Sequence, residues 1–424
     1  MPSAAIAPDG VTRLSDRPPP SEGKEPSAAR QYDRRLRLGI YADLVFRRDE
    51  QGLSADRAFV AFIAGLASRF DEIVLFGRLD PVPGRSPHPV PSERIQFVAL
   101  PHYPRVASIS RLAGAYRGSV TAFAKELPRL DAAWLFGPHP LALAFARVAR
   151  SRRVAVFLGV RQDFPQYVAL RLPNRRWLWA IPAAHVLERA FRRLARHAPA
   201  VVVGEDLGRR YRRAGASVLV TGFSLVPASE LVPLEDALAR PWGGELRLLS
   251  VSRLDPEKNP LLLVDVLARL RARHPGWRLT VVGSGPLEAA LRRRADELGV
   301  ANAIELRGYV PAGPELWAVY RSSHALLHVS LTEGVPQILF EAQAAGLPVV
   351  ATDVGGVRAA LGGGETALLV PPEDAGAAVD ALERIRLEGD LRRRLIAAGL
   401  ESVANETLDA QLDRIAEFFR TSLR

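Results

Sequence analysis

Short apolar runs alternate with amphipathic helical segments along most of the chain. Such runs are typical of strands buried on both faces of a parallel sheet. A first series of predicted strands covers residues 36–41, 72–76, 95–100, 132–136, 154–158 and 200–203, and a second covers 246–252, 278–282, 304–308, 325–329, 348–352 and 367–370. Because helical patterns separate these strands, the rhythm predicts two α/β domains, each with a parallel sheet between layers of helices.

Three segments interrupt this rhythm and divide the chain. Residues 1–34 are rich in Pro, Ser, Ala and charge, which predicts a disordered tail. Residues 224–245 contain clustered Pro and Gly and are predicted to link an N-terminal domain (35–223) to a C-terminal domain (246–403). Residues 404–424 place apolar side chains at helical spacing, which predicts a final helix.

Composition narrows the classes of protein. The chain has 424 residues, of which 48% are hydrophobic, and it contains no cysteine, which excludes disulfides and thiolate metal sites. Without a long uncharged apolar run or an apolar signal core, we expect a cytoplasmic protein. The net charge of +11 predicts anionic partners, which include nucleotide phosphates, acidic lipids and nucleic acid, and charge alone does not choose among them.

The segment Thr332–Glu341 is the most informative stretch of the second domain. It follows a predicted strand, and Pro336 fits the first position of a helix, so the backbone of residues 333–335 is expected at a helix N-terminus that favours anions. Glu341 falls inside an apolar helix, where a carboxylate needs a hydrogen-bond partner. The alternative is that Glu333 is solvated and Glu341 pairs with a structural arginine.

Two further loops of this domain carry candidate ligand groups. Arg253 and Lys258 follow the first strand, and Asn259 with Pro260 fits the start of the next helix. Both cations are therefore expected at the carboxyl edge of the sheet, where open α/β sheets bind ligands. The segment 283–286 has the sequence Gly-Ser-Gly-Pro, with Pro286 expected at a first helical position. Alternatively, the cations are solvated and the glycines serve turn geometry only.

These motifs and their order resemble glycosyltransferase family 4, a retaining family among the glycosyl transferases group 1. The resemblance rests on Arg253 and Lys258, on the glycine turn, and on Glu333 and Glu341 in the pattern E-x7-E. It is strong over residues 246–400 and looser over 36–223. It implies the GT-B fold, with two facing Rossmann-like α/β domains, parallel sheets, and a C-terminal helix that returns to the first domain.

The resemblance also implies roles for individual residues. The residues implied to bind a nucleotide-sugar donor are Arg253, Lys258, Gly283, Gly285, Tyr309, Val310, Gly334, Val335 and Glu341. Arg253 and Lys258 would hold the diphosphate, since charge develops there as the bond to the sugar breaks. Glu341 would accept the ribose hydroxyls, and Glu333 is the implied catalytic residue, placing the anomeric carbon of the sugar.

The acceptor side in the first domain is less defined. Relatives often carry a glycine pair in the loop after the first strand, but residues 42–46, predicted as that loop, have none. A histidine often found after the strand at 154–158 is also absent. The acceptor-side candidates are Asp43, His139, Arg161 and Asp163, although a histidine in a turn such as 137–140 is commonly structural. His324 and His328 are predicted to be packed.

The predicted function is retaining transfer of a sugar from a UDP- or GDP-linked donor to a saccharide, lipid-linked or small-molecule acceptor. No D-x-D pattern is present, so we expect no metal, and no cofactor besides the nucleotide sugar. Nucleic acid is not expected as a partner. The alternatives are a nucleotide-sugar epimerase of similar fold, or a noncatalytic basic protein that binds nucleic acid or a membrane.

Residues 171–196 combine tryptophan, leucine and arginine in a helical pattern. Basic amphipathic helices with tryptophan bind anionic membranes, so peripheral contact with the inner face of a membrane is one interpretation. The alternative is a helix that packs on the core and exposes a solvated basic side.

Overall fold

The computed structural model describes residues 36–423, apart from positions 58, 92, 104–108, 170–171, 173–176 and 223. The predicted disordered tail over residues 1–34 lies outside the described residues.

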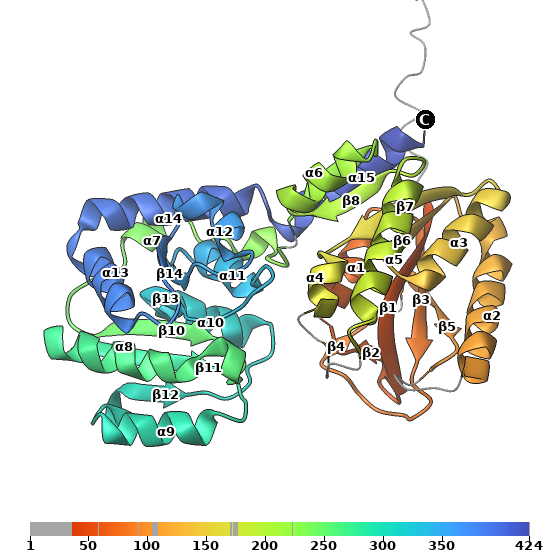
Figure 1. The fold of residues 1–424 in the computed structure, drawn as a ribbon. Coiled ribbons are helices and arrows are strands. Elements are labelled where there is room, and N and C mark those ends of the chain that lie inside the picture. The colour runs from red at the N-terminus through yellow and green to blue at the C-terminus, as the bar shows by residue number, and fades with distance from the viewer. Residues whose placement is uncertain are drawn as a thin grey trace, which may run out of the picture. The chain divides into compact units, whose positions relative to one another are not determined.

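The N-terminal domain is built on a nine-stranded sheet (Figure 1). Seven strands run parallel in the order β5-β3-β1-β6-β7-β8-β9, while β2 and β4 pair antiparallel at the end of β1. The strands are β1 (Arg37–Asp49), β2 (Gly52–Ala55), β3 (Glu72–Leu79), β4 (His88–Pro89), β5 (Ile95–Leu100), β6 (Ala132–Gly137), β7 (Ala155–Val160), β8 (Ala200–Val203) and β9 (Val218–Thr221). The sequence pattern did not predict β2, β4 or β9.

The first strand corrects one prediction. Residues 42–46, predicted as a loop, belong to β1, which continues to Asp49 after a register shift against β3 between Tyr41 and Val45. The physical reason is that Leu44 and Phe46 are buried in the core, while the chain beyond them pairs with β2 as a hairpin.

Helices cover both faces of this sheet (Figure 1). They are α1 (Phe59–Leu66), α2 (Ile109–Glu126), η2 (Leu127–Arg129), α3 (Pro140–Ser151), α4 (Phe164–Ala169), α5 (Ala180–Ala195) and α6 (Glu205–Arg213). On one face, α1 shares a core with the C-terminal helix α15 (Leu408–Ser422), whose Phe419 ring lies 3.9 Å, centroid to centroid, from that of Phe157. This packing confirms that the final helix returns to the first domain.

The C-terminal domain has a six-stranded, fully parallel sheet in the order β12-β11-β10-β13-β14-β15. Its strands are β10 (Leu246–Val251), β11 (Trp277–Val282), β12 (Ile304–Leu306), β13 (Ala325–His328), β14 (Val349–Thr352) and β15 (Leu368–Val370). Successive residues of β10 point to opposite faces, so Leu248 enters one hydrophobic core and Leu249 the other. The predicted strands are present, with ends that differ by one or two residues.

The helices of this domain also lie on both faces, and short helices occupy the predicted linker. They are η4 (Ala228–Glu230), α7 (Leu234–Leu238), η5 (Pro256–Lys258), α8 (Pro260–Arg273), α9 (Glu288–Glu297), η6 (Ala301–Ala303), α10 (Pro314–Ser322), α11 (Gln337–Ala344), α12 (Val357–Ala360), η7 (Gly362–Gly364), α13 (Ala375–Leu387) and α14 (Gly389–Ala404). Together the two sheets confirm the predicted α/β class.

Two predicted helix starts are wrong by a short distance. Pro336 is the N-cap of α11 in an extended conformation (φ −71°, ψ 124°), one residue before the helix. Pro286 precedes α9 by two residues, because Leu287 first donates its backbone N–H to the carbonyl of Leu254 in the neighbouring loop. Within the described part of the chain, every helix is too short or too polar to cross a membrane.

Candidate functional site

The order of the strands in the C-terminal sheet marks one place on its carboxyl edge. β10 is the first strand, and the chain then builds outward on one side of it through β11 and β12, before crossing back to start β13 on its other side. Loops that leave β10 and β13 therefore run in opposite directions, and the crevice between them is where doubly wound sheets bind ligands. Arg253 and Lys258 follow β10, and Glu333 follows β13.

Lys258 and Glu333 meet at this switch point. The Nζ atom of Lys258 lies 2.5 Å from Oε1 of Glu333, and Nε2 of His328, the last residue of β13, lies 3.2 Å from the same oxygen. Burial alone would favour the neutral carboxyl, but His328 and Lys258 outweigh it and lower the pKa of Glu333 to about 2. Glu333 is therefore ionised at neutral pH and accepts hydrogen bonds only.

Backbone contacts hold the two loops together beside this pair. The N–H of Leu331 donates to the carbonyl of Glu257 over 2.8 Å. Arg253 is exposed and forms ion pairs with Asp255 and Glu257 of its own loop, the latter at 3.0 Å. An arginine held this way keeps N–H donors of its planar fork for a ligand. Its contact with a diphosphate stays a prediction.

The glycine turn after β11 packs against the loop after β10. A Cβ on Gly283 (φ +134°) would lie 1.9 Å from the carbonyl oxygen of Ser252, and one on Gly285 would lie 2.6 Å from the backbone of Leu254. Close packing of two loops therefore requires both glycines, independently of any ligand. Their implied role in binding the donor stays a prediction.

The turn at residues 307–310 is the next loop along this edge. The carbonyl of Gly308 accepts a hydrogen bond from the N–H of Gly283 at 2.7 Å. The two implied donor-binding residues of this turn differ in accessibility, because the side chain of Val310 is buried in the core whereas Tyr309 is 60% exposed. Of the two side chains, only that of Tyr309 is open to a ligand.

Glu341 has a partner, but it is not the arginine of the alternative interpretation. The hydroxyl of Tyr320, a fully buried residue of α10, donates to Oε2 of Glu341 over 2.6 Å. Burial raises the pKa of Glu341, and the hydrogen bond from Tyr320 offsets only part of this effect. The sequence analysis did not single out Tyr320, whose role depends on the packing of α10 beside α11.

A second glycine pair supports the loop that carries Glu333. A Cβ on Gly355 would lie 2.0 Å from the carbonyl oxygen of Glu333, and one on Gly356 would lie 2.0 Å from that of Gly334. Gly355 also has a positive φ of +54°, which favours glycine. Side chains at these positions would displace the loop, in which Gly334 and Val335 are exposed. A Gly-Gly pair after a strand is the signal that would have found them.

The N-terminal sheet gathers polar side chains at its own switch point, between β1 and β6. Asp43 lies 2.9 Å from Nε of Arg78 and 3.7 Å from Nε2 of His139. Nδ1 of His139 accepts the N–H of Leu141 at 3.2 Å, which caps α3, and lies 2.9 Å from the hydroxyl of Tyr41. His139 is thus structural and also adjoins Asp43.

The other two acceptor-side candidates contact protein groups elsewhere. The guanidinium of Arg161 lies 4.1 Å from the ring centroid of Phe59, and burial lowers the pKa of this arginine to about 10. Asp163 pairs with Arg210 and accepts the N–H of Gln166 at 3.2 Å, at the start of α4. These packing contacts account for both residues without a substrate. Asp43 and His139 are the two candidates that the structure brings together.

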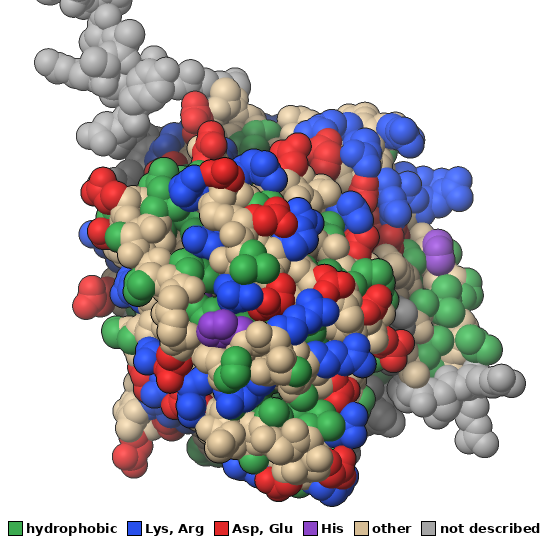
Figure 2. Space-filling model, turned by 90° about the vertical axis from the view of Figure 1, so that its left-hand side faces the viewer, with side chains coloured by type: hydrophobic (Ala, Val, Ile, Leu, Met, Phe, Trp, Pro, Cys, Tyr) green, Lys and Arg blue, Asp and Glu red, His purple; other side chains and the backbone are tan. Residues whose placement is uncertain are grey.

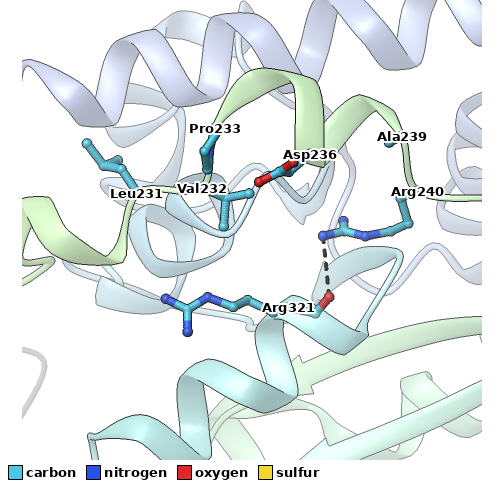
Figure 3. A pocket seen from close by; sticks show the side chains of 7 residues that line it. All are labelled: Leu231, Val232, Pro233, Asp236, Ala239, Arg240 and Arg321. Atoms are coloured by element: carbon cyan, nitrogen blue, oxygen red, sulfur yellow. Dashed lines mark hydrogen bonds between the residues drawn. The ribbon is translucent and has the colours of Figure 1, made fainter.

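A hollow at the predicted linker is lined by Leu231, Val232, Pro233, Asp236, Ala239, Arg240 and Arg321 (Figure 3). The guanidinium of Arg240 donates to the carbonyls of Gly346 and Ala345, both at 3.2 Å, and to that of Arg321 at 3.4 Å. These carbonyls include the end of α11, where a cation complements the helix dipole. Arg240 therefore caps a helix there, and we do not assign the hollow a ligand.

Opposite charges alternate on the surface. On the face drawn in Figure 2, Lys and Arg side chains are interspersed with Asp and Glu. Pairs such as Arg292–Glu288 at 2.8 Å and Arg384–Glu388 at 2.9 Å form along single helices. This face lacks the continuous basic field that a nucleic-acid backbone needs. In the described residues, no group of three or more His, Asp and Glu side chains is placed to hold a metal ion.

The two switch-point sites and the two sheets define the class of protein: a two-domain α/β protein with the GT-B fold of glycosyltransferases. Residues 240–402, which include most of the C-terminal domain, match the family model of glycosyl transferases group 1. The predicted resemblance is confirmed at this level.

Individual relatives agree with this class. The chain is 38% identical to a D-inositol 3-phosphate glycosyltransferase of Corynebacterium jeikeium over 150 residues. These residues cover 34% of this chain and 35% of that protein. The chain spans less than half the length of the curated relatives that it matches.

Two solved structures are similar in fold across both domains. A sucrose-phosphate synthase from Thermosynechococcus elongatus has a TM-score of 0.63 at 21% identity, over 92% of this chain and 99% of that chain. The Anabaena protein HepE, solved in complex with UDP, has a TM-score of 0.63 at 14% identity, over 91% of this chain and 100% of that chain. At these identities the likeness shows the fold alone.

Proposed function

We propose that this protein is a retaining glycosyltransferase that moves a sugar from a UDP- or GDP-linked donor to an acceptor hydroxyl. The observation that carries the proposal is the contact between Lys258 and Glu333 at the switch point of the C-terminal sheet. It places a cation and an ionised acid side by side where this kind of sheet binds ligands. A nucleotide sugar offers the matching pair of groups, a diphosphate and a hydroxylated ring.

Lys258 would neutralise the leaving diphosphate. In the reaction, the bond between the anomeric carbon and the phosphate oxygen breaks with its electron pair left on the diphosphate. The acceptor oxygen bonds to the same carbon and its proton passes to an oxygen of the leaving diphosphate. A lysine ammonium has three donors, so Lys258 can keep its contact with Glu333 and also hold a phosphate oxygen. Arg253 could donate further hydrogen bonds to the diphosphate from the outer side of the loop.

Glu333 would hold the donor sugar rather than donate a proton. With a pKa of about 2, its carboxylate stays ionised at neutral pH and acts as an acceptor for sugar hydroxyls. Glu341 would accept the ribose hydroxyls, and Tyr320 would fix the direction of its carboxyl group. These roles assign the sugar to the loop and the nucleoside to the helix.

The acceptor hydroxyl would bind near Asp43 in the N-terminal domain. Because Nδ1 of His139 accepts the backbone N–H of Leu141, the proton of a neutral imidazole lies on Nε2, on the side of Asp43. His139 is therefore a positioning residue for Asp43 and not a base. Asp43 has an exposed carboxylate that can accept a hydrogen bond from an acceptor hydroxyl.

A donor screen tests this function. The full-length protein is incubated with UDP- and GDP-sugars without acceptor, and free nucleotide and sugar products are measured. We expect slow release of UDP or GDP from one donor, and selective thermal stabilisation by the matching nucleotide. An isomerised donor would indicate an epimerase, and equal stabilisation by all nucleotides would indicate an electrostatic binder. No release and no stabilisation would contradict the proposal.

We further propose that turnover needs no divalent cation, because Lys258 and Arg253 supply positive charge beside the expected diphosphate. Adding EDTA to the donor assay is expected to leave the rate unchanged. Loss of turnover with EDTA, restored by magnesium or manganese, would contradict this part of the proposal and leave the transfer reaction itself standing.

A further inference from the structure

The helix α5 has two opposite sides of different chemistry. Its buried side consists of Ala184, Glu188, Phe191 and Ala195, which anchor it to the N-terminal domain. Residues 182, 186, 189, 193 and 196 recur at intervals of three and four and are exposed. This spacing puts them on one stripe, opposite the buried side.

The first half of this stripe is apolar. Val186 is 70% exposed, and the segment just before the helix presents Trp179 at 62% and Leu178 at 53% exposure. The ring centroids of Trp177 and Trp179 are 5.7 Å apart, so the two indoles form one exposed aromatic cluster. Leaving a large apolar side chain in water costs on the order of 2 kcal/mol relative to burial, so such a cluster marks an interaction site.

The second half of the stripe is basic, and acidic side chains in the described part of the chain do not neutralise its positive charge. Among the described residues, Arg189 and Arg193 form no ion pair with an acidic side chain, whereas Arg192 between them turns inward to Glu188 at 3.7 Å. Some exposed arginines elsewhere are paired along their helices, as Arg209 is with Asp206, whereas Arg147 and Arg150 of α3 also form no ion pair among the described residues. The charge on this stripe is therefore available to an external anion.

We propose that this α5 face, formed by Trp177, Leu178, Trp179, Val186, Arg189 and Arg193, docks on an anionic membrane surface. Tryptophan and aliphatic side chains enter the boundary between head groups and acyl chains, and arginines contact acidic head groups. A second copy of this chain is a poorer occupant, because an identical face, with no acidic side chain among its six residues, would offer Arg189 and Arg193 no opposite charge. The inference does not depend on the proposed transfer reaction.

Vesicle sedimentation tests the inference with the full-length protein. We expect co-sedimentation with phosphatidylcholine vesicles that contain phosphatidylglycerol, but not with phosphatidylcholine alone, and weaker binding at high salt. The double variant Arg189→Glu/Arg193→Glu is expected to lower the partition coefficient at least about tenfold. Trp177→Ser/Trp179→Ser is expected to lower it as well, through the apolar half of the face.

The matched control is Arg147→Glu/Arg150→Glu, which makes the same charge change on exposed residues of α3 in the same domain. It is expected to retain binding. Equal loss in the control would mean general charge attraction and overturn the assigned face, and no binding to anionic vesicles would overturn the inference altogether. If the tryptophan variant instead converts an oligomer of the wild type to a monomer, the face is a protein contact. All variants are compared after confirming an unchanged melting temperature.

Discussion

The ammonium of Lys258 lies 2.5 Å from the carboxylate of Glu333, although 75 positions separate the two residues in the chain. The contact exists because β10 and β13 are neighbours in the sheet, so that the loops after them start at the same edge. Both Lys258 and His328 approach Oε1 of Glu333, and no hydrogen bond from the described residues reaches Oε2. The second oxygen is left for a ligand hydroxyl.

Replacement of this acid is expected to damage turnover more than nucleotide binding. Glu333→Gln removes the charge that holds the sugar, and we predict a fall in turnover of roughly 100-fold or more. Affinity for free UDP or GDP, measured by calorimetry, should change little, since neither nucleotide carries the sugar. Glu365→Gln, at an exposed position, is the control. A loss of nucleotide affinity as large as the loss of turnover would reverse the assigned role.

The same acid predicts a pH dependence of stability. The pKa of Glu333 is lowered from 4.5 to about 2, so its ionised form stabilises the fold above pH 4.5, and this contribution is lost as the pH falls toward 2. The shift corresponds to on the order of 3 kcal/mol at most. Melting temperatures between pH 5 and 2 should fall less steeply for Glu333→Gln than for the wild type. Parallel curves would contradict the pairing with Lys258 and His328.

Glu341 is expected to lower the stability of the fold while contributing to nucleotide binding. Because burial raises its pKa, ionising it costs stability as the pH rises above its unfolded value. Glu341→Gln should therefore raise the melting temperature at neutral pH while weakening UDP or GDP binding about tenfold or more. A variant with lower stability and intact nucleotide affinity would show that the acid is structural.

Tyr320→Phe tests whether the hydroxyl directs that acid. The variant leaves Oε2 of Glu341 without its partner at 2.6 Å, so both stability and nucleotide affinity should fall, with a stability loss of about 1–3 kcal/mol. In the double variant with Glu341→Gln, the further effect of Tyr320→Phe on affinity should vanish. An unchanged effect in both backgrounds would mean that Tyr320 acts independently.

On the acceptor side, Asp43→Asn should separate transfer from donor hydrolysis. We predict a clear loss of sugar transfer to an acceptor with hydrolysis of the donor retained, since Asp43 belongs to the N-terminal sheet and Glu333 to the loop after β13 of the C-terminal sheet. Asp163→Asn is the control, because Asp163 is engaged with Arg210 and should affect stability only. Equal loss of hydrolysis in Asp43→Asn would contradict an acceptor role.

Much of the fold follows from sequence pattern because parallel strands are apolar throughout and the helices between them are amphipathic. The hydrophobic pattern fails to predict strands whose pairing depends on segments elsewhere in the chain. Residues 42–46 continue β1 because the strand runs on to residues 46–49, which pair with β2, and β9 is short and only partly buried. The preference of proline for the start of a helix predicts that start to within one or two residues. The exact first residue depends on hydrogen bonds to neighbouring loops, such as that from Leu287 to Leu254.

For the site, the sequence predicts which residues lie at the sheet edge but not which of them touch. His328 was predicted to be packed, and it is buried, yet its ring also adjoins Glu333 because the strand ends there. Glu341 was predicted to need a partner, and Tyr320 supplies it from a helix whose packing the pattern does not specify. Charge and spacing in the sequence identify candidate site residues, but the order of the strands in the sheet determines which of them lie in contact.

Calorimetric titration of UDP and GDP into the wild type and into Lys258→Met tests the central assignment most directly. The account predicts that the wild type binds one of the two nucleotides preferentially, and that Lys258→Met weakens this binding roughly tenfold or more, since a charged contact to phosphate is lost. Lys125→Met, at an exposed lysine of α2, should bind like the wild type. Equal affinity of Lys258→Met and wild type, with both proteins folded, would contradict the account.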